Sequence, residues 1–328
     1  MSVPYQLNWL VPAPTDLRAK NLTDLMSRCW FHLGKTKRTT PILHEADGGD
    51  YIKVSALEET GIATIYDQDL LLFLIARVVQ DKNDGKKLSP FVQFTGADFW
   101  DFLGKKFSKT GKITNRNKLE YDRLDEMVHR LKGTQIETNI RKGTIRENLK
   151  FNWLSSVRTL EPVRVQQLAD ERINKGEQPF KDSDPRSYRK GFEVELPEWI
   201  MEPIRRENPH VLTYNHQYFK ITKGIERFLY QFARKASGSN PAGWFESLDN
   251  IYEKSGTTSP KRVFVSRIKK ILENNKESFF VGLDKENREE VRLLEYQINP
   301  VQKGRKMGLR FTRSKALPTK REAIEFTN

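Results

Sequence analysis

One order of secondary-structure patterns occurs twice along this chain of 328 residues, and it limits the fold more than any other feature. In the first half, helical patterns at 67–80, 96–103 and 114–133 are followed by runs of β-type residues. In the second half, helical patterns at 224–236, 243–254 and 260–273 are again followed by β-type runs. The sequences of the halves do not visibly align, so the architecture is repeated and the sequence is not.

Three helices followed by a β-hairpin wing describe a winged helix, a variant of the helix-turn-helix. We therefore predict an α+β, mainly helical chain with two tandem winged-helix domains. Residues 1–50 are weakly periodic and predict a loosely structured N-terminal arm with one short helix near 22–33. Pro203 and Pro209 interrupt regular structure and mark the boundary between the halves. The expected organisation is an arm at 1–50, winged-helix domain 1 at 51–204 with a polar surface insertion at 161–190, winged-helix domain 2 at 205–315, and a C-terminal tail at 316–328.

The charge distribution favours a polyanionic partner. The net charge is +14, and the last 75 residues hold 18 Lys and Arg against 9 Asp and Glu, which is +9 of that surplus. A strongly basic surface attracts nucleic acid. An anionic membrane fits less well, because no basic amphipathic helix with a broad apolar face stands alone. A merely soluble cationic enzyme is the remaining alternative.

A basic helix at 260–273 follows a short glycine-containing turn, EKSGTTS, at 253–259. Ser259 suits the N-cap and Pro260 the first helical position. Lys261 and Arg262 then stand at the positive end of the helix dipole, which is unfavourable in water but suits contact with a phosphate or a guanine. The apolar residues Phe264, Ile268, Ile271 and Leu272 share the opposite face, and an ordinary solvated basic helix is the alternative. The candidate DNA contacts here are Thr258, Ser259, Lys261, Arg262, Ser266, Lys269 and Lys270.

Two further basic segments are candidate DNA contacts. Residues 296–321 include eight basic residues and no acid, which suits phosphate contacts by a hairpin wing, although a basic tail that binds nothing specific is the alternative. Arginines spaced by seven lie on one stripe of the helix at 114–133, but Asp122 and Glu126 near that stripe equally suit a salt-bridged surface helix. The candidates are Lys303, Arg305, Lys306, Arg310 and Arg313 in the wing, and Arg116, Arg123 and Arg130 in the helix.

Signals for catalysis or a cofactor are weak. Six residues separate Gly104 from Gly111 where a phosphate-binding loop has four, and Ile113 replaces the Ser or Thr that would hold magnesium. The five histidines lack the spacing of a metal-dependent nickase, and the one cysteine, Cys29, excludes an intrachain disulfide framework. We expect no enzyme activity, no cofactor and no metal. No apolar run reaches 18 residues and no signal-peptide pattern begins the chain, so we also expect a cytoplasmic location and no membrane partner.

A series of collinear segments resembles bacterial plasmid replication initiators of the RepA type. The segments span most of residues 65–275 and include DQDLLLFLIARVV, VQFTGADFWDFL, FEVELPEWI and LTYNHQYFKITKGIERFLYQFARKASG. The two most specific are RLKGTQIETNI at 130–140 and EKSGTTS at 253–259. The loop at 104–118 departs from the family's glycine-rich loop before the first recognition helix, which weakens the assignment of Arg116 more than that of Arg123.

The resemblance implies sequence-specific binding to repeated double-stranded sites, called iterons, at a plasmid origin. By analogy, the second winged helix places its basic helix in the major groove, and the first contributes backbone contacts and a homodimer interface in equilibrium with monomer. It also implies origin opening, recruitment of the host initiator and replicative helicase, and autorepression. A winged-helix transcriptional repressor without an initiator role is the runner-up, and a DNA-processing enzyme is a third possibility.

Overall fold

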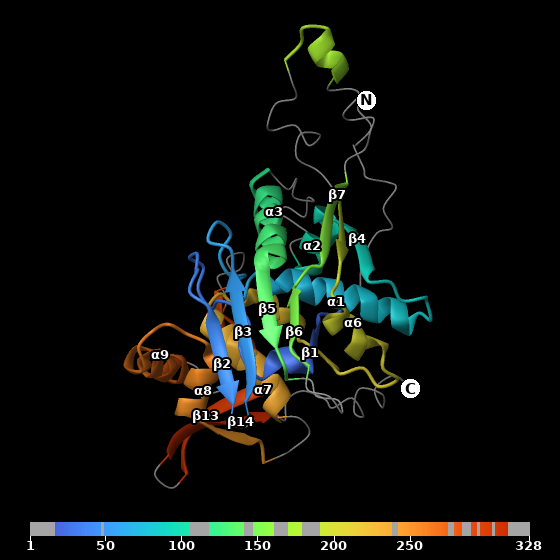
Figure 1. Cartoon of the computed structure of the whole chain (residues 1–328). Coiled ribbons are helices and arrows are strands. Elements are labelled where there is room, and N and C mark those ends of the chain that lie inside the picture. The colour runs from blue at the N-terminus through green and yellow to red at the C-terminus, as the bar shows by residue number, and fades with distance from the viewer. Residues whose placement is uncertain are drawn as a thin grey trace, which may run out of the picture.

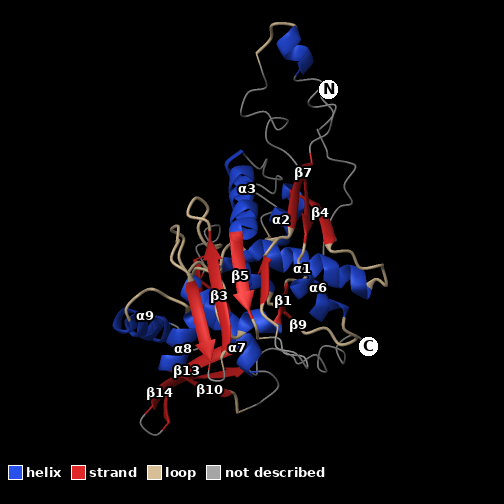
Figure 2. Ribbon diagram, in the orientation of Figure 1, coloured by secondary structure: helices blue, strands red, loops and turns tan. Residues whose placement is uncertain are grey.

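The computed structural model describes residues 17–46, 49–104, 118–140, 147–160, 170–178, 191–237, 242–274, 279–283, 290–293, 296–303 and 306–313. It is an α+β protein in which helices alternate with short strands (Figure 1, Figure 2). Strands and helices take up comparable lengths of the described chain, so the expectation of a mainly helical chain overstates the helical share. Many strands have only three to five residues, which is too short for an alternating pattern to stand out in the sequence.

The first half contains three helices and a three-stranded antiparallel sheet in the order β4-β8-β7. The middle helix starts at a capping box, in which the hydroxyl of Thr95 and the carboxylate of Asp98 satisfy each other's backbone N–H groups. Leu160 pairs with Gly191, so both ends of the polar segment 161–190 lie on one hairpin. The bounds are α1 (Gln68–Asn83), β4 (Phe91–Thr95), α2 (Gly96–Phe102), α3 (Lys118–Gly133), β7 (Ser156–Leu160) and β8 (Gly191–Glu195).

The second half repeats this order of elements, and its sheet has the corresponding order β10-β14-β13. The expected helix at 243–254 is shorter than predicted, because Trp244–Ser247 forms a strand and Ser247 caps the helix that follows. Phe245 therefore lies on the strand and not on a helix. The bounds are α7 (Gly224–Ser237), β10 (Trp244–Ser247), α8 (Leu248–Ser255), α9 (Lys261–Asn274), β13 (Tyr296–Lys303) and β14 (Lys306–Arg313).

Each half carries an additional hairpin between its third helix and the last two strands of its sheet. In the first half, α3 runs directly into β5 (Thr134–Thr138), which pairs with β6 (Leu149–Asn152) as the sequence predicted. β5 also joins β3 (Asp50–Ala56) and β2 (Ile42–Ala46), giving a four-stranded sheet in the order β2-β3-β5-β6. In the second half, β11 (Phe279–Leu283) pairs with β12 (Glu290–Leu293).

The described part of the N-terminal segment is folded, so the expectation of a loosely structured arm at 1–50 is wrong for residues 17–46. The strand β1 (Lys20–Leu22) pairs with β9 (Val211–Thr213) of the second half, and the 3₁₀ helix η1 (Thr23–Met26) packs against α7. Trp30 is fully buried between Trp153 and Trp199, with ring centroids 5.9 Å and 5.2 Å away. Aromatic burial of this size stabilises a segment that has no periodic pattern of its own.

A buried polar contact joins the halves through α1 and α7. The guanidinium of Arg227 donates to Asp69 at 2.7 Å, and both residues are almost fully buried. Gln231 donates to Gln68 at 2.6 Å beside this ion pair. The remaining linking elements are the helix α6 (Glu198–Arg205), which continues past Pro203, and η2 (His216–Lys220). Helix formation through Pro203 corrects the expectation that this proline interrupts regular structure.

The helix α1 lies at the centre of the core, and its residues from Leu70 to Ala76 are fully buried. It is covered on several sides by β1, β4, α2 and α6, which explains why its sequence is apolar on nearly every face (Figure 1). Within the described ranges, neither α1 nor another helix has both the length and the apolar character that crossing a bilayer requires.

Candidate nucleic-acid interface

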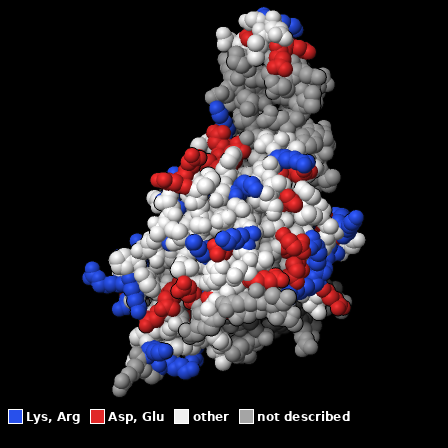
Figure 3. All heavy atoms as spheres, in the orientation of Figure 1, with Lys and Arg blue, Asp and Glu red and all other residues white. Residues whose placement is uncertain are grey.

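The helix α9 separates its apolar and basic residues as the sequence predicted. Phe264, Ile268 and Ile271 are buried, and Leu272 packs against the core from its edge. Arg262, Ser266, Lys269 and Lys270 are exposed on the other side. Figure 3 shows the basic atoms of this region gathered at the end of the molecule that α9 forms.

The first turn of α9 begins one residue later than predicted. The carbonyl of Pro260 accepts hydrogen bonds from Val263 and Phe264 at 2.8 and 3.1 Å, so Pro260 is the N-cap and Lys261 the first helical residue. The hydroxyl of Ser259 instead accepts from Arg267 at 3.3 Å, and Thr258 is exposed in the turn. A shallow groove of about 480 Å³ runs along this end of the helix and is lined by Lys261, Arg262, Val265, Ser266 and Lys269.

Lys261 forms an ion pair with Asp249 of α8 at 2.8 Å. Both side chains are more than half exposed, so this pair contributes little to stability. Arg262 and Lys269 have no such partner among the described residues, and their charges are open to a ligand in the groove. The dipole of α9 adds to the attraction of an anion at this end.

The hairpin β13–β14 places three of the predicted wing residues on the surface. Lys303 pairs with Lys306 at the end of the hairpin, and Arg310 lies opposite Asn299. All three basic side chains are exposed, and the ammonium of Lys303 lies 5.8 Å from the ring centroid of Phe245. Arg305 and the side chain of Arg313 lie outside the described residues.

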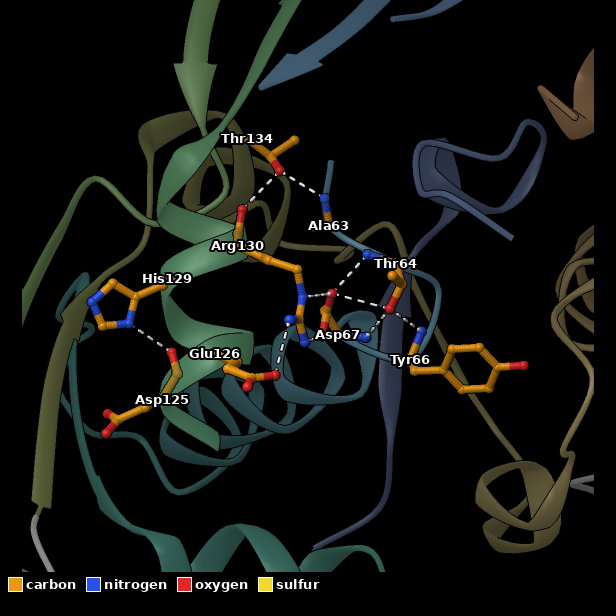
Figure 4. A network of polar contacts seen from close by, with 9 residues as sticks. All are labelled: Ala63, Thr64, Tyr66, Asp67, Asp125, Glu126, His129, Arg130 and Thr134. Carbon is orange, nitrogen blue, oxygen red and sulfur yellow. Dashed lines mark hydrogen bonds and ion pairs between the residues drawn. The ribbon is translucent and has the colours of Figure 1, made fainter. Parts of the chain in front are cut away.

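The predicted arginine stripe of α3 divides into members with different surroundings. Arg116 lies outside the described residues, and Arg123 is exposed. Arg130 is only 26% exposed, and its Nε and Nη2 atoms donate to both carboxylate oxygens of Asp67 at 2.8 and 2.9 Å (Figure 4). Glu126, one turn earlier, is a further partner at 3.3 Å. The hydrogen bonds that Arg130 donates to Asp67 and Glu126 outweigh burial and raise the pKa of Arg130 above its ordinary value.

Asp67 connects α3 to the segment that precedes α1, a role that no sequence pattern predicted. Its carboxylate also accepts from the backbone N–H of Thr64 at 2.7 Å and from the hydroxyl of Thr64 at 3.0 Å (Figure 4). Thr134, at the start of β5, accepts from the N–H of Ala63 and donates to the carbonyl of Arg130. These contacts fix the C-terminal end of α3. These contacts join residues that are far apart in the sequence, so no local sequence pattern predicts them.

The two candidate helices differ in charge. α9 holds five basic residues and one acid, whereas α3 holds four of each. Figure 3 shows acidic atoms over the outer part of α3. A cleft of about 890 Å³ lies beside α3 and is lined by both signs of charge, including Arg123, Glu126, Arg130, Lys35 and Glu59. Across the described residues, no group of three His, Cys, Asp or Glu side chains is arranged to hold a metal ion.

Comparison with known proteins identifies the family. The family model described as replication initiator protein A matches residues 20–280. A protein of Wigglesworthia glossinidia brevipalpis described as "Putative replication protein" is 30% identical over 230 residues, covering 70% of this chain and 72% of the relative. The chain belongs to the replication initiator protein A family.

A solved structure shows the same fold at low sequence identity. The crystal structure of domains 2 and 3 of RctB matches with a TM-score of 0.56 and 14% identity, over 90% of this chain and 99% of that structure. The match therefore includes both halves and their connection, and the arrangement of the two halves is that of a known fold.

Proposed function

We propose that this protein binds repeated double-stranded sites at a plasmid origin and starts replication there. The observation that carries the proposal is the basic, outward-facing α9, which follows a glycine turn within a helix and sheet order that occurs in both halves. The family of the chain supports the same conclusion. DNA attracts such a surface because each basic group that meets a phosphate releases a condensed counterion.

Each half is, in this proposal, a winged helix with an extra hairpin. The helix, strand, helix, helix order is followed by the extra hairpin and then by two further strands. The first strand pairs with the last in both sheets, β4-β8-β7 and β10-β14-β13. α9 then corresponds to the recognition helix of a helix-turn-helix, with α8 as the helix before it. The hairpin β13–β14 is the wing of the second half, and its Lys303, Lys306 and Arg310 contact phosphates.

In this arrangement α9 lies in the major groove and reads bases. Arg262, Ser266 and Lys269 lie on the exposed side of the helix, within its first nine residues. An arginine or lysine at such positions pairs most favourably with guanine, and a serine can contact any base. The wing supplies affinity and register, because phosphate contacts carry no sequence information.

The remaining parts of the proposal follow the family resemblance. The protein binds its sites as a monomer, exists also as a homodimer, opens an adjacent AT-rich segment, and recruits the host initiator and replicative helicase. It represses its own promoter, and it acts by binding and without catalysis or a cofactor, in the cytoplasm.

A footprint on the DNA that flanks the gene tests the proposal. Purified full-length protein is expected to protect direct repeats beside an AT-rich block, with centres spaced by whole helical turns. A single protected palindrome would favour a repressor instead. Nicking or ATP hydrolysis by the purified protein would support a DNA-processing enzyme.

Plasmid replication tests the role of α9. A plasmid that carries the gene and its flanking DNA should stop replicating when Lys261 and Arg262 are both replaced by Ala. The matched control is the double replacement of Lys86 and Lys87, which are exposed and follow the end of α1. Continued replication of the Lys261 and Arg262 variant would refute the role of this helix.

A further inference from the structure

The turn between α8 and α9 determines the direction in which α9 leaves the second half. Gly256 ends α8 in the left-handed conformation, with φ of +59°, and its N–H donates to the carbonyl of Glu253. Within the second half, the hydroxyl of Tyr252 donates to the carbonyl of Ser259 at 3.0 Å. The turn is short, so a small change in its backbone would change the angle of the whole helix.

A residue from the N-terminal segment holds this turn from outside. The Nη1 atom of Arg38 donates to the carbonyl of Gly256 at 2.6 Å, across 218 residues of sequence. Its Nε and Nη2 atoms donate to the carbonyls of Thr40 and Pro41 at 2.8 and 3.0 Å. Every acceptor of this guanidinium among the described residues is a backbone carbonyl. Arg38 thus supplies the positive charge that favours the C-terminal end of a helix, and it caps α8.

The same segment makes further contacts with α8 and its turn. The N–H of Cys29 donates to the carbonyl of Lys254, in the last turn of α8, at 2.8 Å. A Cβ atom on Gly256 would lie 2.7 Å from Cγ2 of Ile42, so β2 packs directly against the turn. The carbonyl of Arg38 itself accepts from the N–H of Ile62 at 2.7 Å, which anchors the loop that carries it.

These contacts connect α9 to the first half through one sheet. β2 pairs with β3, β3 pairs with β5, and β5 continues without a break from α3 (Figure 1). The end of α3 is in turn fixed by Arg130 and Asp67. A rigid sheet between two elements transmits their relative orientation, because its paired strands cannot slide without losing their register.

We propose that Arg38 is a positioning residue for DNA recognition, which fixes the angle of α9 from the first half without touching DNA. The inference rests on the proposed function of α9. Loss of the Arg38 contact lets the turn relax, so α9 enters the groove at an altered angle and its base contacts weaken. Phosphate contacts of the wing are less affected, because they do not depend on the turn.

The test compares two variants that remove one positive charge from the same loop. Arg38→Gln removes the contact with Gly256. Lys37→Gln is the control, because Lys37 is an exposed neighbour with no hydrogen bond to the turn among the described residues. Dissociation constants of the full-length proteins are measured on the duplex that the footprint identifies and on a scrambled duplex of the same composition, over a range of salt concentrations. Arg38→Gln should bind the specific duplex about tenfold more weakly, the size of one lost base contact, and the scrambled duplex unchanged.

The salt dependence separates positioning from direct contact. If Arg38 acts only through the turn, the slope of log affinity against log salt stays the same, because no phosphate contact is lost. Arg38→Lys, which keeps the charge and one donor group, should recover part of the specific affinity. A specificity ratio in Arg38→Gln equal to that of Lys37→Gln would overturn the proposal, as would a slope reduced by about one unit, the mark of a direct phosphate contact.

Amide hydrogen exchange tests the positioning without DNA. In Arg38→Gln the amides of residues 256–259 should exchange faster than in Lys37→Gln, while those of α1 keep their protection. Unchanged exchange in the turn would refute the contact as an anchor. If the wild-type protein prefers no flanking duplex but the turn loosens in Arg38→Gln, the proposed function fails and the anchor stands.

Discussion

The ion pair between Arg130 and Asp67 allows a quantitative prediction, because the structure defines what remains when it is broken. Arg130→Ala leaves the Asp67 carboxylate, which is 1% exposed, with two hydrogen bonds from Thr64 as its remaining ones within the described part of the chain. Removing one partner of a buried ion pair costs about 3–5 kcal/mol. Because Arg130 is 26% exposed, water can reach the vacated position, and we expect a loss near the lower end, about 3 kcal/mol.

Urea unfolding of the full-length protein measures this loss, and Arg123→Ala is the matched control. Arg123 lies two turns earlier on α3, is exposed, and should change the free energy of unfolding by less than about 0.5 kcal/mol. The thermal midpoint of Arg130→Ala should fall by about 4–5 °C. A free energy of unfolding for Arg130→Ala within 0.5 kcal/mol of that for Arg123→Ala would refute the reasoning.

DNA binding separates the two interpretations of Arg130 that the sequence left open. If the ion pair with Asp67 is its main role, the folded Arg130→Ala variant should bind a scrambled duplex with the wild-type salt dependence. If Arg130 instead contacts phosphate, the slope of log affinity against log salt should fall by about one unit while stability changes little.

Two further predictions concern pH and packing. Burial lowers the pKa of His44, and the charges of Arg28 and Arg38 lower it further, so the folded state binds fewer protons than the unfolded state. Stability from neutral His44 is therefore complete above pH 6.5 and is lost as the pH falls through the lowered folded pKa, by up to about 1.4 kcal/mol per pH unit. The free energy of unfolding, measured with urea, should therefore fall less between pH 7 and 5 in His44→Gln than in the wild-type protein. Gly308→Ala should lower the urea midpoint by the equivalent of about 1–3 kcal/mol, because its Cβ would lie 2.3 Å from the carbonyl oxygen of Glu246; a cost below about 0.5 kcal/mol would show that the β10–β14 pair has room.

Segments with a periodic pattern of apolar residues were predictable from the sequence, because the local spacing of those residues determines which side of the element is buried. α1, α3, α7 and α9 lie close to where the spacing of apolar residues placed them, and the buried face of α9 is the predicted one. The hairpin wing expected within 296–321 corresponds to β13 and β14. Local pattern is sufficient where one face of an element meets the core.

The N-terminal segment was not predictable in the same way, because its stability comes from contacts with residues far along the chain. Trp30 packs against Trp153 and Trp199, and Arg38 binds a carbonyl 218 residues away. Neither contact produces a periodic pattern of apolar residues from which it could be predicted. Arg130 shows the same limit, since its spacing suggested an exposed stripe and only the fold brings Asp67 to it.

The difference between α3 and α9 suggests how the two halves divide their work. α9 has a surplus of positive charge on its exposed side, and its turn is held by backbone contacts that leave its exposed side chains available. α3 has no surplus, and the last arginine of its stripe is bound to Asp67. A helix with balanced charge gains little from phosphates, whereas a helix fixed at its end and continuous with a sheet can orient a neighbour. In the proposed initiator, the second half would therefore supply most of the sequence reading, and the first half would hold that reader at a defined angle.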